Sequence, residues 1–371
     1  MIRLTIPTIE DDDFAAVREA LASGYLVQGP RVAAFEEKLA ASTTAKHCVV
    51  VSNCTSALQL ALMALGIDAG DTVIVPTYSW PATANVVELV GAELVFVDIE
   101  PSTFNMSSKA LEQKLDSLKD RRVRAIIPVH AFGQTADMTA IGALASARNI
   151  PIIEDAACAL GATWNGKQAG TMSAMGCFSF HPRKAITTGE GGAITTDDAQ
   201  HAAKLRALRN HGLDPAAPGP EFLLAGFNMR MTEMQAALGI TQLAKLGRIV
   251  KARQRLAERY GELFAMTRVA APRSATGAVP VYQSYVVTLP EDAAPRRAEI
   301  IAKLRERGVE TTIGTWHIPL TKFYREKYGY KAGDFPGSES AFSRALTLPL
   351  FESMTDAQVD EVASKVLDVV G

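Results

Sequence analysis

Short runs of β-branched and other apolar residues alternate with stretches of helical spacing through the first part of the chain. Strands that are separated by single helices predict βαβ units, which build a mostly parallel sheet with helices on both faces. We therefore expect an α/β fold whose ligands bind at the carboxyl ends of the strands. The strand-like runs are Cys48–Val51, Val73–Val75, Leu94–Val97, Ala125–Val129 and Ile152–Ile153, and the helical stretches are Ser56–Leu65, Ala82–Leu89, Lys109–Leu115 and Ala140–Arg148.

A second pattern follows the last of these strands. After Ala193–Thr196 the sequence becomes helical, with one long helix expected from about Thr232 to Phe264. Strand-like and helical segments then mix, without the earlier regular alternation. With 371 residues and about 150 residues per domain, we expect two domains. The large one covers residues 1–250 with the N-terminal segment, and a small α+β domain covers residues 251–371.

Composition excludes several classes of function. Lys and Arg number 38 and Asp and Glu 40, for a net charge of −2, so no global field attracts nucleic acid or an anionic membrane. No apolar run approaches the roughly 18 residues of a membrane span, and the start MIRLTIPTIEDDD lacks the order of a signal peptide. The four cysteines show no metal-ligand spacing. We expect a cytoplasmic protein with reduced thiols, no structural metal, and no nucleic-acid or membrane partner.

The segment Ser52–Ala57 follows a predicted strand and opens a helix. Free backbone N–H groups and the hydroxyls of Thr55 and Ser56 would converge there, where the helix dipole favours a phosphate. The alternative is that Thr or Ser simply caps the helix. The segment is neither a GxGxxG nor a P-loop motif, which disfavours dinucleotides and nucleoside triphosphates.

Two adjacent carboxylates, Glu154 and Asp155, end the strand at Ile152–Ile153. An acid at this edge of the sheet can pair with a protonated heterocycle nitrogen or coordinate Mg²⁺. It can also cap the following helix. A pair of carboxylates at a buried strand end needs a partner, which favours a functional role.

Lys184 lies between a predicted strand and the glycine-rich turn Gly189–Gly192. A lysine in a loop is usually solvated, but desolvation lowers the pKa of a lysine and makes it a nucleophile for Schiff bases. Pyridoxal 5′-phosphate (PLP) requires a phosphate cup, a carboxylate for its ring nitrogen and a Schiff-base lysine. All three features occur here in order along the chain, so PLP is the expected cofactor.

Several segments together resemble the DegT/StrS family of PLP-dependent nucleotide-sugar aminotransferases. The resemblance runs from about Ile6 to about Leu350. It implies the aspartate-aminotransferase fold, type I: a large PLP-binding domain with a mostly parallel seven-stranded sheet, a small C-terminal α+β domain, and a homodimer with shared active sites. The segments are VSNCTSALQLAL, GDTVIVPTYSWPATAN, EDAACALGATWNGKQAG, FSFHPRKAITTGEGGAITT and GFNMRMTEMQAALG.

The resemblance also implies roles for single residues. Lys184 would form the Schiff base and carry the proton, and Asp155 would keep the ring nitrogen protonated. Trp80 matches the aromatic residue that stacks on the ring, although an ordinary core position is the alternative. The residues that match the phosphate cup are Thr55, Ser56 and Ser179.

Further residues match less firmly. Asn228 resembles the residue that reaches the phosphate from the neighbouring subunit. Cys158 stands where relatives often carry Gln or His near the phenolic oxygen of the cofactor, and a thiol is a weaker partner. His317 resembles a sugar-site residue, but a lone His is more often structural. Arg183 and Arg230 could meet a carboxylate or a diphosphate, or lie on the surface.

We interpret the chain as a ping-pong aminotransferase that moves an amino group from L-glutamate, through pyridoxamine phosphate, to a nucleotide-linked 4-keto-6-deoxy sugar. The block His181–Lys184 with Gly189–Gly192 resembles the C4-aminating group. Amination at C3 or of a cyclitol is the alternative, and Lys184 disfavours the dehydrating relatives that carry His there. Outside this class, the chain could be a PLP-binding regulatory protein or a metal enzyme that uses Glu154 and Asp155, but no DNA-binding segment is visible.

Overall fold

The computed structural model describes residues 1–118, 121–214 and 216–371. Two helices, α1 (Asp11–Ala22) and α2 (Pro30–Thr43), precede the central sheet. The sheet and its connections comprise β1 (His47–Val51), α3 (Cys54–Ala64), β2 (Thr72–Pro76), β3 (Tyr78–Ser79), α4 (Ala82–Leu89), β4 (Glu93–Val97), β5 (Ile99–Glu100), β6 (Asn105–Met106), α5 (Ser108–Ser117), β7 (Val123–Ile126), η1 (Ala131–Gly133), α6 (Met138–Ser146), β8 (Ile153–Asp155), β9 (Thr163–Trp164), β10 (Lys167–Gln168), β11 (Met175–Ser179), β12 (Gly192–Thr196) and α7 (Ala199–Arg209).

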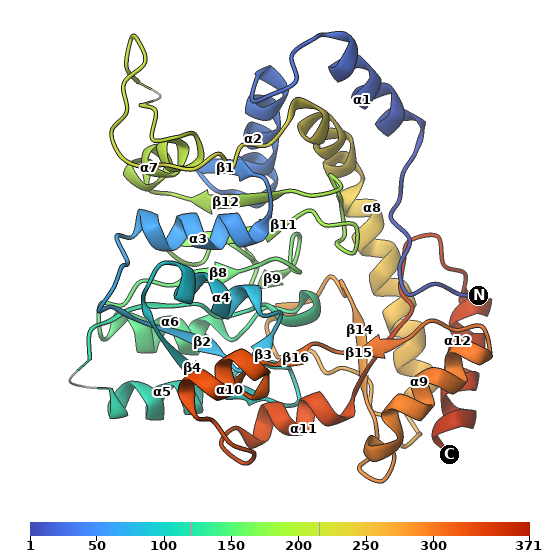
Figure 1. The fold of residues 1–371 in the computed structure, drawn as a ribbon. Coiled ribbons are helices and arrows are strands. Elements are labelled where there is room, and N and C mark those ends of the chain that lie inside the picture. The colour runs from blue at the N-terminus through green and yellow to red at the C-terminus, as the bar shows by residue number, and fades with distance from the viewer. Residues whose placement is uncertain (119–120, 215) are drawn as a thin grey trace.

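The rest of the chain is built around one long helix and a small sheet (Figure 1). Its elements are α8 (Glu233–Phe264), β13 (Ala278–Val279), β14 (Tyr285–Thr288), η2 (Ala294–Arg296), α9 (Arg297–Glu306), β15 (Thr312–Ile313), β16 (Trp316–His317), η3 (Ile318–Leu320), α10 (Lys322–Tyr328), α11 (Pro336–Arg344), β17 (Ala345–Leu348) and α12 (Asp356–Val370).

The central sheet has seven strands, which confirms the prediction. Four strands pair in the order β1-β12-β11-β8 and three in the order β4-β2-β7. The two groups join through parallel bridges from Ile126 to Ile152 and from Val129 to Asp155. Only β12 runs against its neighbours, since it is antiparallel to both β1 and β11. The sheet is therefore mostly parallel, and the carboxyl ends of six strands face one edge.

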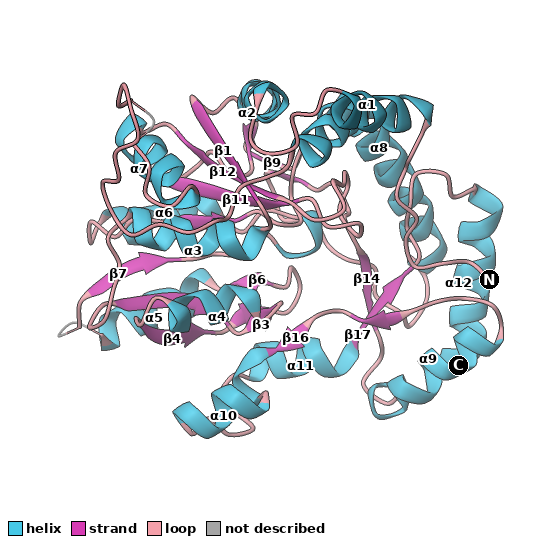
Figure 2. Ribbon diagram, turned by 45° about the horizontal axis from the view of Figure 1, so that its top comes forward, coloured by secondary structure: helices cyan, strands magenta, loops and turns pink. Residues whose placement is uncertain are grey.

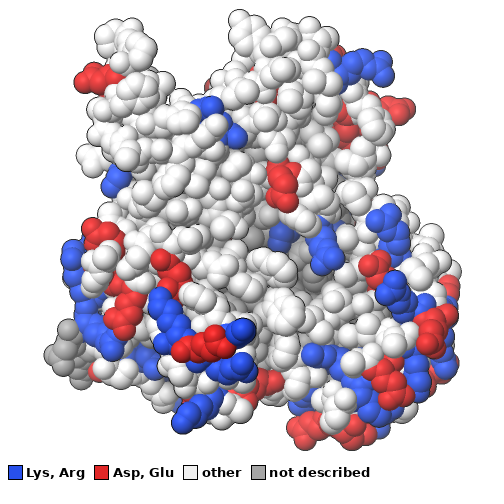
Figure 3. Space-filling model, viewed as in Figure 1, with Lys and Arg blue, Asp and Glu red and all other residues white. Residues whose placement is uncertain are grey.

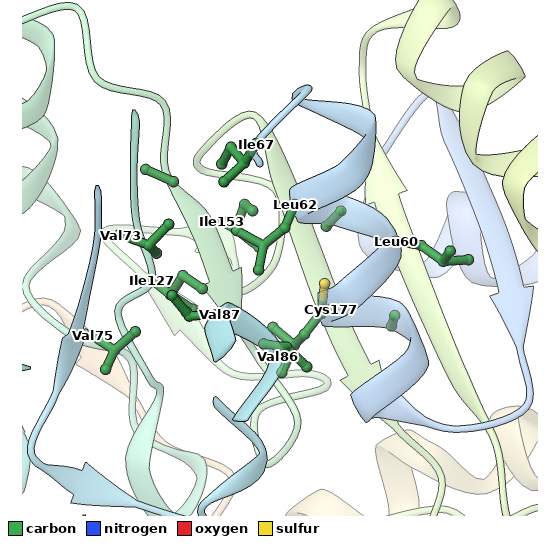
Figure 4. Close-up of a cluster of buried hydrophobic side chains, with 14 of the residues drawn as sticks. Leu60, Leu62, Ile67, Val73, Val75, Val86, Val87, Ile127, Ile153 and Cys177 are labelled. Atoms are coloured by element: carbon green, nitrogen blue, oxygen red, sulfur yellow. The ribbon is translucent and has the colours of Figure 1, made fainter. Parts of the chain in front are cut away.

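Helices cover both faces of this sheet because alternate strand residues point to opposite sides. Val49 and Val73 pack with α3 and α4 in the first core cluster, part of which Figure 4 shows. Val50 packs on the other side with residues of α2 and α8. Ile74 likewise packs against α5 and α6. The α/β architecture with helices on both faces is thus the one expected from the sequence.

A smaller unit lies beside the sheet and is joined to it by α8 (Figure 2). Its antiparallel sheet has the order β14-β17-β15. The last turns of α8 contribute Leu256, Tyr260 and Phe264 to a core that also includes residues of α9 and α12. The predicted domain boundary at residue 250 falls within α8, so the position of that boundary stays a prediction.

The N-terminal segment departs from the predicted division into domains. Ile2 lies in the core of the smaller unit and bridges to Val309. The Leu4 amide donates to Glu310 Oε2 at 2.9 Å. Apolar contact and pairing therefore hold these first residues on the smaller unit rather than on the large one.

Among the described residues, no helix combines the length and hydropathy that a membrane crossing requires.

Candidate active site

Asp155 and Ser179, two of the predicted site residues, lie at the edge of the sheet where β1, β8 and β11 end and β12 begins. Gly192 is the register partner of both Val51 and Ser179, and Asp155 pairs with Cys177 on β11. Asp155 and Cys177 thus lie in a row that is two residues along β11 from the row that Val51, Gly192 and Ser179 form across the sheet. This edge is where ligands bind in open α/β sheets.

Gly192 allows the start of α3 to approach this row. A Cβ atom at this position would lie 2.5 Å from the carbonyl carbon of Asn53 and 2.7 Å from the Cys54 nitrogen. No side chain larger than hydrogen fits there. The glycine therefore allows the N-terminus of α3 to lie next to Ser179. From the sequence alone, Gly192 was expected only to form part of a glycine-rich turn.

Asn53, and not Thr55 or Ser56, caps α3. Its side-chain oxygen accepts from the Ser56 amide at 2.8 Å, and Ser56 Oγ lies 3.2 Å from Ser52 Oγ. The alternative in which Thr or Ser caps the helix is therefore wrong. The first-turn N–H groups of Cys54 and Thr55 point out of the helix, where the dipole favours an anion.

Asp155 is buried, with 5% of its surface exposed. Its Oδ2 accepts from Thr83 Oγ1 at 2.7 Å, and its Oδ1 accepts from the Ala157 amide at 3.2 Å. Burial raises the pKa of Asp155, and these hydrogen bonds oppose the rise. The Ala157 bond is the contact expected of an Asx turn, and β8 is followed by β9 (Thr163–Trp164) rather than by a helix, so the alternative in which this acid caps a following helix is wrong.

Glu154 points to the opposite side of β8 from Asp155 and is fully buried. It accepts from the amides of Gly170 and Met172 at 2.7 Å each and from Ser173 Oγ at 2.9 Å. His130 Nε2 lies 2.9 Å from its Oε2.

This arrangement argues against the metal alternative. The protein occupies the lone pairs of Glu154, and Glu154 and Asp155 face different sides of the sheet. Within residues 1–118, 121–214 and 216–371, no group of three His, Cys, Asp or Glu side chains is placed to hold a metal ion. Glu154 instead holds the loop at residues 170–173, a structural role that sequence reasoning did not assign.

Lys184 reaches the same edge of the sheet from the loop after β11. Its Nζ donates to Cys158 Sγ at 3.0 Å. Burial acts to lower the pKa of Lys184, as predicted, but Cys158, Cys54 and Asp155 outweigh it, so the pKa lies above its ordinary value. The prediction of a lowered pKa is thus wrong for the protein alone, because acidic neighbours surround the amine.

Trp80 and Asn228 both lie on the surface. Trp80 is 67% exposed, which excludes the alternative of a core aromatic. Asn228 is exposed and pairs with Asn210 in an antiparallel bridge. Exposure is the condition that stacking on a ligand or reaching another subunit requires, and both roles stay predictions.

The weaker candidates separate into two kinds. His317 is buried on β16, with its Nδ1 2.8 Å from Ser338 Oγ, and burial lowers its pKa. Arg230 donates to Asn210 Oδ1 at 2.5 Å. Both fit their structural alternatives. Arg183 is exposed, and it lines a hollow with residues of the smaller unit that include Gln283 and Thr312.

The model of the DegT/DnrJ/EryC1/StrS aminotransferase family matches residues 7–367 of the chain. The protein belongs to this family. Membership confirms the predicted family and makes the protein a sugar aminotransferase, for which the family implies PLP.

Named relatives of the DegT/DnrJ/EryC1/StrS family match along nearly the whole chain. The GDP-perosamine synthase of Caulobacter vibrioides is 37% identical over 367 residues, which cover 97% of this chain and 96% of that protein. The UDP-4-amino-4-deoxy-L-arabinose–oxoglutarate aminotransferase of Shewanella sediminis is 34% identical over 385 residues, which cover 98% and 97%. The PLP-form of Spr1654 from Streptococcus pneumoniae superposes with a TM-score of 0.93 at 26% identity, covering 99% and 98%. These matches confirm the predicted fold class.

Proposed function

We propose that the edge of the sheet around Lys184 and Asp155 holds PLP. The observation that carries the proposal is that a half-buried lysine amine and a buried carboxylate lie at the edge of the sheet where the first turn of α3 offers backbone amides to a phosphate. These are the three chemical requirements of the cofactor. Thr55, Ser56 and Ser179 would contact the phosphate, and Trp80 and Cys158 the ring. When bound, PLP supplies an electron sink for breaking a bond at the amino-bearing carbon.

The chain's own residues supply the remaining chemistry. Asp155 as a carboxylate accepts a hydrogen bond from the ring nitrogen and so keeps it protonated. Lys184 Nζ binds the cofactor and, once released, takes up and returns a proton as a general base and acid. Cys158, at 3.0 Å from Nζ, orients the amine.

For the substrates, we propose L-glutamate as the donor and a nucleotide-linked 4-keto-6-deoxy sugar as the acceptor. The names of the relatives support this proposal, because they include a GDP-linked sugar, a 4-amino sugar and oxoglutarate. Arg183, exposed at the hollow beside the smaller unit, is placed to meet a carboxylate or diphosphate. Amination at C3 or of a cyclitol is the alternative within the same class.

We also propose a homodimer with shared active sites. Apolar side chains that a monomer would bury are exposed on the loop before α2 and on the loop after α7: Tyr25 at 66%, Val27 at 54%, Phe222 at 64% and Leu223 at 59%. Figure 3 shows few charged side chains over this part of the molecule. Large apolar side chains exposed on a surface with few charges are typical of an interaction site.

Absorption spectroscopy tests the cofactor and the donor together. The purified protein is incubated with PLP, and its visible band is followed before and after addition of L-glutamate. We expect a band in wild type that glutamate bleaches, with 2-oxoglutarate released. A band that glutamate leaves unchanged would favour the regulatory alternative, and no band would contradict the PLP site.

Product analysis and hybrid dimers test the rest. Nucleotide-linked 4-keto and 3-keto sugars are offered to the glutamate-treated enzyme, and NMR of the product locates the amine at C4 or C3.

Mixing Lys184→Ala with Asn228→Ala subunits tests whether the two subunits share their sites, because one intact site then forms per hybrid dimer. Activity that does not rise on mixing contradicts the shared site.

A further inference from the structure

Thr83 touches the carboxylate that is proposed to serve the cofactor. It is the second residue of α4 and is only 1% exposed. Its Oγ1 lies 2.7 Å from Asp155 Oδ2 and 2.9 Å from Ser79 Oγ, and 3.3 Å from the Trp80 carbonyl. The contact with Asp155 joins residues that are 72 positions apart in the sequence.

The direction of these hydrogen bonds follows from proton counting. A threonine hydroxyl has one proton and two acceptor lone pairs. The proton goes to Asp155 Oδ2, because a carboxylate is the strongest and nearest of the three acceptors. The Thr83 oxygen then accepts from Ser79 Oγ, so a chain of hydrogen bonds runs from Ser79 through Thr83 to Asp155.

This series of hydrogen bonds affects both the charge and the orientation of Asp155. In an apolar, buried site, a carboxyl group tends to take up a proton, and it would then donate to a ring nitrogen instead of accepting from it. A donated hydrogen bond stabilises the charged form. The bonds from Thr83 to Oδ2 and from Ala157 to Oδ1 also fix the plane of the carboxylate.

The smaller unit holds Ser79, the first residue in this series of hydrogen bonds. Ser79 on β3 is the register partner of Trp316 on β16, and Tyr78 is the partner of His317. The Ile318 amide donates to the Thr77 carbonyl at 2.9 Å. The position of Ser79 therefore depends on a strand from the unit that follows α8.

We infer that Thr83 is a positioning residue for amino transfer, which with Ser79 keeps Asp155 ionised and aimed at the ring nitrogen of the cofactor. The inference rests on the proposed PLP site. It assigns a function to the hydroxyls of Ser79 and Thr83. An ordinary turn at the start of α4 would need only the bond from Thr83 to the Trp80 carbonyl.

The test compares Thr83→Val, which replaces the hydroxyl by a methyl group, with Thr83→Ser, which keeps the hydroxyl. Each protein is loaded with PLP that carries ¹⁵N in the ring, and the ¹⁵N chemical shift reports whether that nitrogen is protonated. The rate of the glutamate half-reaction is measured beside it. Thr196→Val is the matched control, because its buried hydroxyl donates to the Ala174 carbonyl at the far end of β12.

We expect the ring nitrogen of Thr83→Val to lose its proton and the half-reaction to slow about 10- to 100-fold, the value of a hydrogen bond to a charged group. Thr83→Ser and Thr196→Val should match wild type, and Ser79→Ala should slow the half-reaction about threefold. If Thr83→Val does not fold, Thr83→Ala takes its place. A protonated ring nitrogen and a wild-type rate in the folded variant overturn the inference. A wild-type protein without a PLP band contradicts the proposed site instead.

Discussion

Lys245 is buried and Lys184 is half-buried, and the two lysines have opposite environments. Lys245 on α8 donates to Asp12 at 2.6 Å and to Asp13 at 2.7 Å, and Glu10 lies 3.4 Å away. Lys184 donates to a single soft acceptor, Cys158 Sγ, at 3.0 Å. A buried ammonium group is costly unless it is paired. The first lysine is therefore satisfied by its own fold, whereas the second keeps N–H donors that are available to a ligand.

The difference teaches how to tell a structural charge from a functional one. Lys245 ties α1 to α8, and its loss would leave Asp13 buried without its cation. Lys184 ties few elements together and lies in the loop between β11 and β12, at the edge of the sheet where Asp155 ends β8. Partial burial with incomplete pairing, at the edge of a mostly parallel sheet, is typical of a functional site.

The largest effect is expected for Lys184→Ala. Because the amine is proposed both to bind the cofactor and to move the proton, the glutamate half-reaction should slow by about a thousandfold or more. The free energy of unfolding should change by less than about 1 kcal/mol, since few partners are lost. Stopped-flow absorbance and urea unfolding measure the two quantities. A rate within tenfold of wild type would mean that the Lys184 amine is not functional, and the contrast with Lys245 would then fail.

Asp155→Asn should have the next largest effect. The amide keeps the size of the side chain but not its charge, so the ring nitrogen is no longer held protonated. We expect the half-reaction to slow about 100-fold, in the range of a positioned acid–base group. Glu154→Gln is the matched control on the same strand. It should leave the rate within about threefold and lower the stability, because its amide would face a backbone N–H.

Lys245→Met sharpens the comparison from the other side. It retains the apolar stem and leaves Asp13 with hydrogen bonds from the Glu10 amide and Gln242. We expect the free energy of unfolding to fall by about 2–4 kcal/mol, as for a broken buried pair, while the half-reaction keeps its rate. An unchanged urea midpoint would show that the pair contributes nothing.

Sequence reasoning located the regular elements better than the contacts between them. Helix α4 lies at Ala82–Leu89 as predicted, and Val49–Val51 and Ile153 lie in buried strands, because apolar periodicity reflects burial directly. The two-residue strands β3 and β16 contain no full period and could not be found this way.

The site was predictable where a motif carries its chemistry locally. Asp155 ends β8, and Lys184 follows β11, the neighbour of β8 in the sheet, as expected from the sequence; their joint role in one site stays a prediction. The contact of Thr83 with Asp155 joins distant segments, so no spacing indicates it. The separation of Glu154 from Asp155 follows from strand alternation, a signal that was present but unused.

The smallest expected effect is the pH dependence of the Lys245 pair. Burial acts to raise the pKa of Asp13, but hydrogen bonds from Lys245 and Thr241 outweigh it, so the pKa lies below its ordinary value. Burial acts to lower the pKa of Lys245, but hydrogen bonds to Asp12 and Asp13 outweigh it and raise it. The stability from Asp13 is therefore present above about pH 3.9 and lost as the pH falls through the lowered pKa. The stability that Lys245 contributes is fully present below about pH 10.4 and is lost as the pH rises through the raised pKa of Lys245.

The difference in free energy of unfolding between wild type and Lys245→Met should therefore be constant between about pH 5 and pH 9. It should shrink toward either limit, which urea unfolding at a series of pH values measures. Thr196→Val is the control, because it removes no titratable group and its stability relative to wild type should not follow this profile. A difference that stays constant beyond both limits would mean that Lys245 acts through packing of its stem, and the contrast between a paired and an unpaired lysine would then lose its electrostatic basis.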